Sequence, residues 1–295
     1  MNFLPVRCAI VGAGGQLAYD LARTFNLPGE VVRLTRADLD VLDRVKVEET
    51  LRAIRPTHVL NGAAYNQVDR AEEEPAAAFA VNAEAVGTLS ATCQALGATF
   101  VHFSTDYVFD GRKGSPYLEG DAPNPLSAYA ASKLAGERMA RERCERVFIF
   151  RVCGLFGIGG LAARGRTLFV ERMLRMAQEG HPIRVVSDQV LAPSYTLDLA
   201  RKVWRVLTVG EPGLYNLTNA GQTSMYDFAR EIFRLSGVAP SSLAPVTMAD
   251  FGAKARRPPY SVLAHGRLAA LGEDDLQPWN EALAAFIRER KEQFS

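Results

Sequence analysis

Short apolar runs alternate with helix-like segments along the first half of the chain, and this alternation restricts the fold more than any other feature. Runs rich in β-branched residues predict strands at 6–11, 31–34, 58–61, 99–104 and 147–152. Their near-continuous apolar character is typical of strands that are buried on both faces. Helices between such strands form right-handed crossovers, which place successive strands parallel. We therefore predict an α/β fold built on a doubly wound parallel sheet.

The second half of the chain continues this pattern less regularly. Apolar periodicity predicts helices at 16–26, 44–54, 76–96, 127–143, 167–179, 197–207, 226–235 and 280–292. Further strands are predicted at 183–187 and 214–218. A glycine-rich stretch at 154–165 separates the two halves. We predict one domain over residues 1–151 and mainly a smaller C-terminal α/β domain over 152–295, with about 183–219 returning to the first domain.

The charge balance excludes broad classes of partner. The chain has 34 Lys and Arg residues against 33 Asp and Glu residues, a net charge of +1, whereas general binders of nucleic acid or acidic membranes carry a basic surplus. No apolar run approaches the ~18–20 residues of a membrane span, and no leader pattern opens the sequence. The cysteines Cys8, Cys93, Cys144 and Cys153 lack metal-ligand spacing and fit reduced thiols. We expect a cytoplasmic protein with no nucleic-acid and no membrane partner.

A glycine loop follows the first predicted strand. Gly12 permits a tight turn, Gly15 lets the backbone approach a phosphate, and Ala18 is small enough for the next helix to pack on the strand. The N-terminus of that helix offers free N–H groups and partial positive charge to a pyrophosphate. A plain turn is the alternative for the glycines alone. Between the first strand and first helix of a parallel sheet, however, the loop predicts a Rossmann-like, NAD(P)-binding domain over residues 1–151.

The end of the second predicted strand bears on which dinucleotide binds. NAD enzymes usually place an acidic residue there for the ribose 2′-hydroxyl, but this chain has Thr35 and Arg36. A hydroxyl and a guanidinium suit a 2′-phosphate, so we predict NADPH, with NADH as the alternative. An ordinary exposed loop arginine is the other interpretation of Arg36. Asp40 and Val41 follow and are expected to flank the adenine.

Polar residues that fit proton transfer follow the fourth predicted strand. Thr105 and Asp106 come at its carboxyl end, the edge where open α/β sheets bind ligands. Tyr129 and Lys133 lie four residues apart at the start of a helix and so share one face. Lowering a phenol pKa of ~10 by about three units takes roughly 4 kcal/mol, which a nearby ammonium helps to supply. We predict Tyr129, Lys133 and Thr105 as catalytic residues; a solvated tyrosine and lysine are the alternative.

Together these motifs resemble the dTDP-4-dehydrorhamnose reductase family of the extended short-chain dehydrogenase/reductase superfamily. The similarity extends over nearly the whole chain, and the segment 104–111 is its most specific part. The segments that carry it are 12–18, 61–65, 68–72, 81–83, 104–111, 129–137, 187–189 and 256–261.

The resemblance implies a reaction and a set of contacts. Hydride would pass from NAD(P)H to the C4 carbonyl of a 4-keto-6-deoxy nucleotide sugar, converting dTDP-4-dehydrorhamnose to dTDP-L-rhamnose, while Tyr129 protonates the oxygen. Lys133 would lower the pKa of Tyr129 and hold the nicotinamide ribose. Thr105 would bind the carbonyl oxygen, and Asp106 a sugar hydroxyl. The cofactor contacts of the family fall on Gly15, Gln16, Leu17, Asp40, Val41, Ala63, Ala64, Tyr65 and Phe103.

The substrate side departs from the family pattern. Where the family reads R-T-S-W-V-Y-G, residues 151–157 read R-V-C-G-L-F-G, so Gly154 replaces the tryptophan that packs on the deoxysugar. Arg257 is a candidate ligand of the nucleotide diphosphate, since a guanidinium fork fits phosphate oxygens; a surface arginine is the alternative. The acidic residues that hold Mg²⁺ at a dimer interface in some members have no match here. We therefore expect no metal, and a homodimer as the assembly to test.

Two other functions remain compatible with the residues. The first is another reaction of the superfamily on a nucleotide sugar, such as epimerisation or dehydration. The second is a non-catalytic regulatory subunit resembling that of methionine adenosyltransferase, which also lacks the tryptophan. Intact Thr105, Tyr129 and Lys133 do not exclude it.

Overall fold

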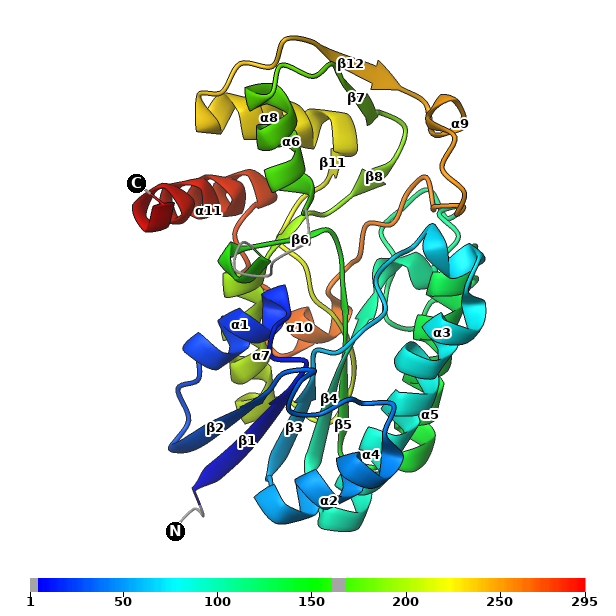
Figure 1. The fold of residues 1–295 in the computed structure, drawn as a ribbon, viewed down its shortest axis with the longest axis vertical. Helices are drawn as coiled ribbons and strands as arrows, with labels where there is room; N and C mark the ends of the chain where they lie inside the picture. Colours follow the sequence, from blue (N-terminus) through cyan, green and yellow to red (C-terminus); the bar gives the residue numbers. More distant parts are fainter. Residues whose placement is uncertain (1–4, 161–167, 295) are drawn as a thin grey trace.

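A parallel sheet forms the centre of the computed structural model, which describes residues 5–160 and 168–294 of the 295-residue chain (Figure 1). The sheet has six strands in the order β10-β5-β4-β3-β1-β2, and every neighbouring pair is parallel. The predicted doubly wound sheet is confirmed. Its strands are β1 (Val6–Val11), β2 (Gly29–Leu34), β3 (His58–Asn61), β4 (Thr99–Thr105), β5 (Val147–Val152) and β10 (Gly213–Asn216).

Helices cover both faces of this sheet. One face carries α1 (Gln16–Arg23), α7 (Thr196–Val209) and α10 (Gly266–Ala270), and the other carries α2 (Arg44–Ile54), α4 (Ala85–Leu96) and α5 (Ala128–Arg143) (Figure 1). Alternate residues of a strand point to opposite faces. In β1, Ile10 accordingly packs in the core with Leu17 of α1 and Trp204 of α7, whereas Val11 packs in the core with Leu51 of α2. The continuous apolar runs of the sequence are explained by this burial on two sides.

The helix predicted over 76–96 is interrupted, and the one predicted over 16–26 ends early, at Arg23. α3 (Pro75–Phe79) is followed by a π-helical turn (Ala80–Glu84) before α4 begins. Asn82 is buried in this turn. Its Oδ1 accepts from the Tyr65 N–H at 2.9 Å, and its Nδ2 donates to the Tyr65 carbonyl at 3.0 Å and to Ser132 Oγ at 2.9 Å. The irregular turn thus fixes the loop that follows β3. Short 3₁₀ turns lie at Arg70–Glu72, Asp106–Val108 and Ile158–Gly160.

A second unit lies above the carboxyl end of the sheet (Figure 1). Its core contains Phe156, whose ring contacts the rings of Phe228 and Phe286 with centroids 5.7 and 5.5 Å apart. The helices of this part are α6 (Phe169–Gln178), α8 (Met225–Ser236), α9 (Met248–Phe251) and α11 (Trp279–Phe294). Its strand pairs are β7 (Ile183–Val186) with β12 (Leu243–Val246), β8 (Val190–Leu191) with β11 (Thr223–Ser224), and β6 (Leu155–Phe156) with β9 (Ser194–Tyr195).

The segment predicted to return to the first domain, 183–219, is shared between the two units. α7 and β10 join the six-stranded sheet, whereas β7 pairs with β12 in the second unit. The domain limits 1–151 and 152–295 stay a prediction. Residues 161–167 lie outside the described residues; they include part of the predicted glycine-rich stretch and the start of the predicted helix 167–179.

Charged side chains join the two units beside α1. Asp20 is buried and accepts hydrogen bonds from the Thr196 hydroxyl and, at 2.5 Å, from Arg23. Arg23 also pairs with Glu289 of α11 at 2.5 Å. Because α1 begins at the glycine loop, this contact holds the predicted cofactor helix against the second unit.

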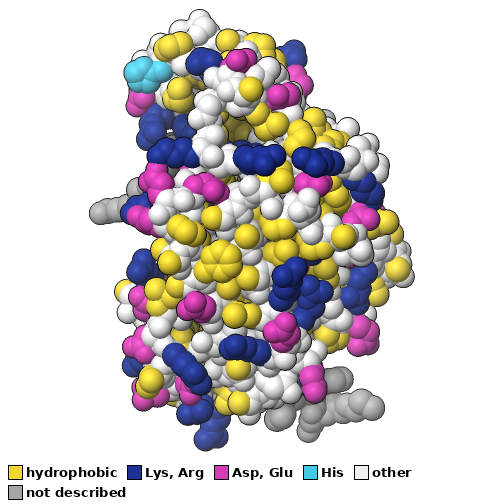
Figure 2. All heavy atoms as spheres, turned by 90° about the vertical axis from the view of Figure 1, so that its right-hand side faces the viewer, with side chains coloured by type: hydrophobic (Ala, Val, Ile, Leu, Met, Phe, Trp, Pro, Cys, Tyr) yellow, Lys and Arg dark blue, Asp and Glu magenta, His cyan; other side chains and the backbone are white. Residues whose placement is uncertain are grey.

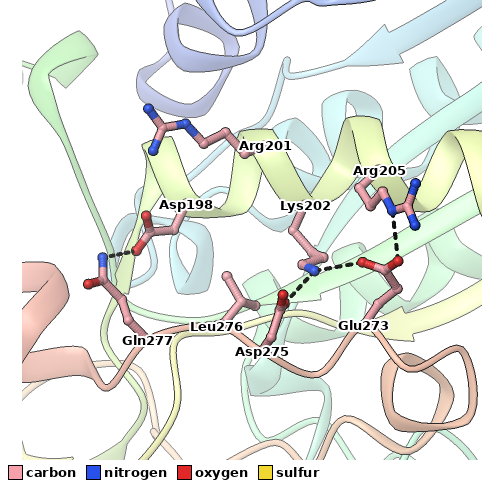
Figure 3. A pocket seen from close by; sticks show the side chains of 8 residues that line it. All are labelled: Asp198, Arg201, Lys202, Arg205, Glu273, Asp275, Leu276 and Gln277. Atoms are coloured by element: carbon pink, nitrogen blue, oxygen red, sulfur yellow. Dashed lines mark hydrogen bonds and ion pairs between the residues drawn. The ribbon is translucent and has the colours of Figure 1, made fainter.

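The surface carries charges of both signs. Figure 2 shows basic, acidic and apolar side chains interspersed over the face on which α3, α4 and α5 lie. A groove of about 470 Å³ runs along α7, where Lys202 pairs with Glu273 at 2.9 Å and with Asp275 at 2.5 Å, and Arg205 pairs with Glu273 at 2.7 Å (Figure 3). These charges pair with one another and attach the chain before α11 to α7. Among the described residues, no helix has the length and apolar character needed to span a membrane.

Candidate active site

The loops after β1 and β3 meet at the point where the strand order of the sheet reverses. β1 and β3 are adjacent, and Gly12 leaves β1 with φ +73°. A Cβ atom on Gly12 would lie 2.5 Å from the Ala63 nitrogen, so only glycine fits. Gly15 caps α1 and donates its N–H to the Gly12 carbonyl at 2.9 Å. The structure therefore brings Gly12, Gly15 and Ala63 together at the switch point, where open α/β sheets bind ligands.

The start of α1 fits a pyrophosphate. The first N–H groups of a helix have no partner within the helix and favour an anion. Leu17 is buried, and among residues 5–160 and 168–294 the buried Gln16 Oε1 has no hydrogen-bond partner. An unpaired buried acceptor at this place, together with the glycine backbone, fits a bound dinucleotide.

The predicted ribose-phosphate site after β2 includes an acid, Asp38, in addition to the predicted residues. The Thr35 amide and hydroxyl both donate to Asp38, at 2.9 and 2.7 Å. These bonds lower the pKa of the Asp38 carboxyl. Arg36 is 86% exposed and lies 3.6 Å from Asp40. Of the two predicted phosphate ligands, the Arg36 side chain is therefore the one that can reorient freely; Val41 is buried nearby.

The loop after β3 holds the next three predicted cofactor residues by its backbone. Asn61 Oδ1 accepts from the Ala63 N–H at 3.1 Å, and Asn82 fixes the Tyr65 backbone. Ala64 lies between these two anchored residues. The Tyr65 hydroxyl donates to Glu74 at 3.3 Å. Because Ala63 is small, the loop lies close to Gly12. The hydrogen bonds from Asn61 and Asn82 fix the backbone conformation of the loop.

The predicted catalytic residues come from β4 and α5. Thr105 ends β4, and Ser127 caps α5 by accepting from the Ala130 N–H at 3.2 Å, which sets Tyr129 in the first turn. Lys133 is buried, and its Nζ donates to the Phe103 carbonyl of β4 at 2.5 Å. Phe103, a predicted cofactor contact, thus positions the predicted catalytic lysine.

The surroundings of Tyr129 keep its phenol protonated. Burial of the hydroxyl end raises its pKa above the ordinary value, although hydrogen bonding from Thr105 acts in the opposite direction and the charge of Asp106 adds to the rise. Burial also lowers the pKa of Lys133 to about 8, against the effect of Glu137. Lys133 was predicted to lower the pKa of Tyr129, but in the protein without cofactor the desolvation of the phenol dominates and raises this pKa. A protonated phenol at neutral pH is suited to give a proton.

Asp106 lies in a buried polar cluster beside this pair. Thr105 Oγ1 donates to Asp106 Oδ1 at 3.1 Å, and the Cys153 thiol contacts Oδ2 at the same distance. Burial raises the pKa of Asp106 to about 6, more than Ser261, Cys153 and Thr105 lower it. The Tyr107 ring contacts the Tyr129 ring edge-on, with centroids 6.3 Å apart. Hydroxyl, carboxyl and phenol groups therefore converge on one place.

Sequence reasoning missed a buried ion pair behind Lys133. Glu137 accepts from Arg151 Nε and Nη2 of β5 at 2.9 and 2.7 Å, and from the Ser104 hydroxyl at 2.5 Å. The spacing was a usable signal, because Tyr129, Lys133 and Glu137 follow one another at intervals of four on α5. The carboxylate raises the pKa of Lys133 and so favours its charged form.

Comparison with known proteins agrees with this geometry. The family model described as the RmlD substrate binding domain matches residues 6–292. The chain belongs to the RmlD family. A dTDP-4-dehydrorhamnose reductase from Burkholderia thailandensis is 37% identical over 96% of this chain and 99% of its own length. The spore coat polysaccharide biosynthesis protein SpsK of Bacillus subtilis is 37% identical over 95% and 96%.

Solved structures agree with the family assignment. A dTDP-4-dehydrorhamnose reductase from Bacillus anthracis, in complex with NADP, superposes with a TM-score of 0.91 at 33% identity, over 97% of this chain and 100% of the other. A Thermus thermophilus UDP-glucose 4-epimerase in complex with NAD reaches a TM-score of 0.79 at 22% identity, over 97% and 99%. The second likeness concerns the fold alone.

In this RmlD-family chain, Gly154 stands where a tryptophan would not fit the backbone. Gly154 has φ +52°, a conformation that L side chains rarely adopt. A Cβ there would lie 2.9 Å from Leu191 Cδ1 and 3.2 Å from the Pro193 Cα. A larger side chain at position 154 would therefore be both strained and crowded in this chain.

Arg257 is bound to an acid. Its Nη1 and Nη2 donate to Asp69 at 3.1 and 2.8 Å, and this pairing lowers the pKa of Asp69. Asp69 also accepts from the Ala255 N–H at 3.0 Å. Arg257 thus joins the 255–257 segment to the loop after β3. Within residues 5–160 and 168–294 there is no group of three or more His, Cys, Asp or Glu side chains that could hold a metal ion; the absence of a metal stays a prediction.

Proposed function

We propose that this chain reduces the C4 carbonyl of a 4-keto-6-deoxy nucleotide sugar, converting dTDP-4-dehydrorhamnose to dTDP-L-rhamnose with NADPH. The observation that carries the proposal is the placement of Tyr129 and Lys133 one turn apart on α5, with Thr105 at the carboxyl end of β4 and Lys133 held by the Phe103 carbonyl of the same strand. Burial raises the pKa of the Tyr129 phenol, which favours its protonated form. Relatives that match over nearly their whole length are named dTDP-4-dehydrorhamnose reductase, and one solved relative is in complex with NADP.

The residues divide the work of this reaction. Bound NADPH supplies the hydride that reaches the carbonyl carbon. Tyr129 donates its proton to the carbonyl oxygen, and Thr105 donates a hydrogen bond to the same oxygen in place of its bond to Asp106. Lys133, held by the Phe103 carbonyl and largely charged below a pKa of about 8, stabilises the phenolate that forms and holds the nicotinamide ribose. Asp106 binds a sugar hydroxyl.

The cofactor-binding residues follow from the same proposal. The N-terminus of α1 with Gly12, Gly15, Gln16 and Leu17 holds the pyrophosphate. Asp40 and Val41 flank the adenine, Thr35 and Arg36 meet the 2′-phosphate, and Ala63, Ala64, Tyr65 and Phe103 line the nicotinamide side.

A turnover assay tests the reaction. With dTDP-4-dehydrorhamnose, we expect one NADPH to be oxidised for each sugar reduced. An epimerase or dehydratase would keep its dinucleotide through purification and consume none. A regulatory subunit would show no turnover with any 4-keto nucleotide sugar and would co-purify with a partner enzyme. Sedimentation of the purified chain tests the homodimer, and fractionation tests the cytoplasmic location.

Removal of the Arg36 charge tests the choice of cofactor. We expect Arg36→Ala to weaken NADPH binding roughly tenfold, the effect of losing one charge-assisted contact to phosphate, and to leave NADH binding nearly unchanged. Titration of protein fluorescence with each dinucleotide measures both affinities. Arg33→Ala removes a neighbouring exposed arginine and serves as the control. Equal losses for NADPH and NADH would contradict the assignment of the 2′-phosphate to Arg36.

A further inference from the structure

Glu72 binds the start of the helix that carries Tyr129. Its Oε1 accepts a hydrogen bond from the N–H of Ala128, the first residue of α5, at 2.7 Å. The two residues are 56 positions apart in the sequence, so this bond joins the loop after β3 to α5. The mechanism described above does not use Glu72.

The first turn of α5 requires acceptors from outside the helix. The first four N–H groups of an α-helix have no partner within it. Ser127, the N-cap residue, accepts from the Ala130 N–H at 3.2 Å, and Glu72 accepts from the Ala128 N–H. The partial positive charge of a helix N-terminus also favours a carboxylate there. Two acceptors from different parts of the chain therefore hold the turn that contains Tyr129.

The 3₁₀ turn that presents Glu72 is itself anchored. Ala71, in the middle of this turn, is buried. Arg70 pairs with Glu74 at 2.8 Å, and the Glu74 carboxylate accepts from the Tyr65 hydroxyl at 3.3 Å. Because Tyr65 is a predicted cofactor contact, the turn relates the start of α5 to the cofactor side of the site.

The neighbouring acids of this loop bind a different part of the chain. Asp69 pairs with Arg257 at 2.8 Å, and Glu73 pairs with Lys254. Both of these bonds attach the loop to the segment that follows α9. Glu72 differs from them because its bond is to α5.

We propose that Glu72 is a positioning residue for the reduction, because it holds the first turn of α5 so that the Tyr129 hydroxyl lies where the substrate carbonyl can receive its proton. The inference rests on the proposed function for the reaction that this position serves. Glu72 acts through α5 and not on the reacting atoms. Misplacing a reacting group by about 1 Å costs up to about 10²-fold in rate, so loss of this bond affects kcat more than binding.

Hydrogen exchange tests the contact without requiring turnover. Glu72→Met keeps a side chain of similar length without the acceptor, and we expect amide exchange over residues 127–133 to become roughly threefold faster. Glu73→Met is the matched control, because it removes the adjacent carboxylate, which pairs with Lys254 at the surface. We expect exchange over 127–133 to be unchanged in this control. Unchanged exchange in Glu72→Met would overturn the inference, whatever reaction the chain performs.

Kinetics with dTDP-4-dehydrorhamnose test what the position serves. We expect Glu72→Met to lower kcat roughly tenfold, while KM for the sugar and the affinity for NADPH stay within about twofold. The retained NADPH affinity also shows that the variant is folded. Glu72→Gln keeps an oxygen that can accept from the Ala128 N–H, so its kcat is expected to stay within about threefold of normal. For Glu73→Met we expect kcat within about twofold of normal.

These outcomes separate the inference from the proposed function. If the unaltered chain reduces no 4-keto nucleotide sugar, the proposed function is wrong, and faster exchange in Glu72→Met still supports the placement of Tyr129 by Glu72. If the sugar is reduced and Glu72→Met has faster exchange but a normal kcat, Glu72 only stabilises the helix, and the inference is wrong. A raised KM in place of a lowered kcat, or a loss in Glu73→Met equal to that in Glu72→Met, also overturns it.

Discussion

Phenylalanine in place of Tyr129 is expected to lower kcat for reduction of the 4-keto sugar by roughly 10²–10⁴-fold, the usual contribution of a positioned general acid. The substitution removes one oxygen from a residue whose ring contacts Tyr107 and whose hydroxyl meets Thr105. The carbonyl oxygen then has no proton donor, and the Thr105 hydroxyl alone stabilises its developing charge. Turnover of NADPH with dTDP-4-dehydrorhamnose measures the loss.

Two comparisons make this result specific. Tyr226→Phe on α8 removes a phenol remote from β4 and α5 and is expected to keep full activity. NADPH affinity of Tyr129→Phe is expected to stay within a few-fold of normal, because the pyrophosphate loop and α1 are untouched. Full reductase activity in Tyr129→Phe would exclude this residue as the proton donor and with it the mechanism proposed above.

The sheet was predictable because the information for it is local. Each strand from β1 to β5 is an apolar run, and each helix between them has its own periodicity, so the sequence indicates the parallel order without tertiary knowledge. β10 was predicted as a strand, but its place beside β5 depends on contacts between residues such as Asn216 and Arg151, which are remote in the chain. The π-helical turn at Ala80–Glu84 was missed because its alanine-rich sequence is compatible with a regular helix.

The identity of the site residues could be predicted from the sequence, but their protonation states and their partners could not. Spacing of four residues put Tyr129 and Lys133 on one face of α5. The direction of the Tyr129 pKa shift did not follow from spacing, because it depends on how much protein surrounds the hydroxyl. Likewise the partner of Arg257, Asp69, is 188 residues away in the sequence, and no local pattern joins them. Pairings across elements become evident only in the folded chain.

Removal of the Glu137 charge is expected to have the largest effect on stability. Glu137→Gln keeps the size of the side chain but leaves Arg151 as a buried cation. Arg151 is 1% exposed, and its guanidinium lies 5.0 Å from the centre of the Phe109 ring. Its Nη1 already lacks a hydrogen-bond partner in the part of the chain that the structure describes. Breaking one side of a buried ion pair costs about 3–5 kcal/mol. That is a large fraction of the roughly 5–15 kcal/mol by which folded domains are stable.

Urea unfolding of matched variants measures this cost. Glu142→Gln lies on the exposed side of the same helix and is expected to change the free energy of unfolding by less than about 0.5 kcal/mol. The double variant Glu137→Leu with Arg151→Met removes both charges and is expected to recover much of the lost stability, because the unpaired cation is then absent. If Glu137→Gln unfolds at the same urea concentration as Glu142→Gln, the buried pair does not support the junction of β4, β5 and α5. We expect the double variant to recover stability while its NADPH-dependent turnover stays low, because Lys133 still lacks the carboxylate that favours its charged form. This result would separate the role of Glu137 in packing from its role toward Lys133.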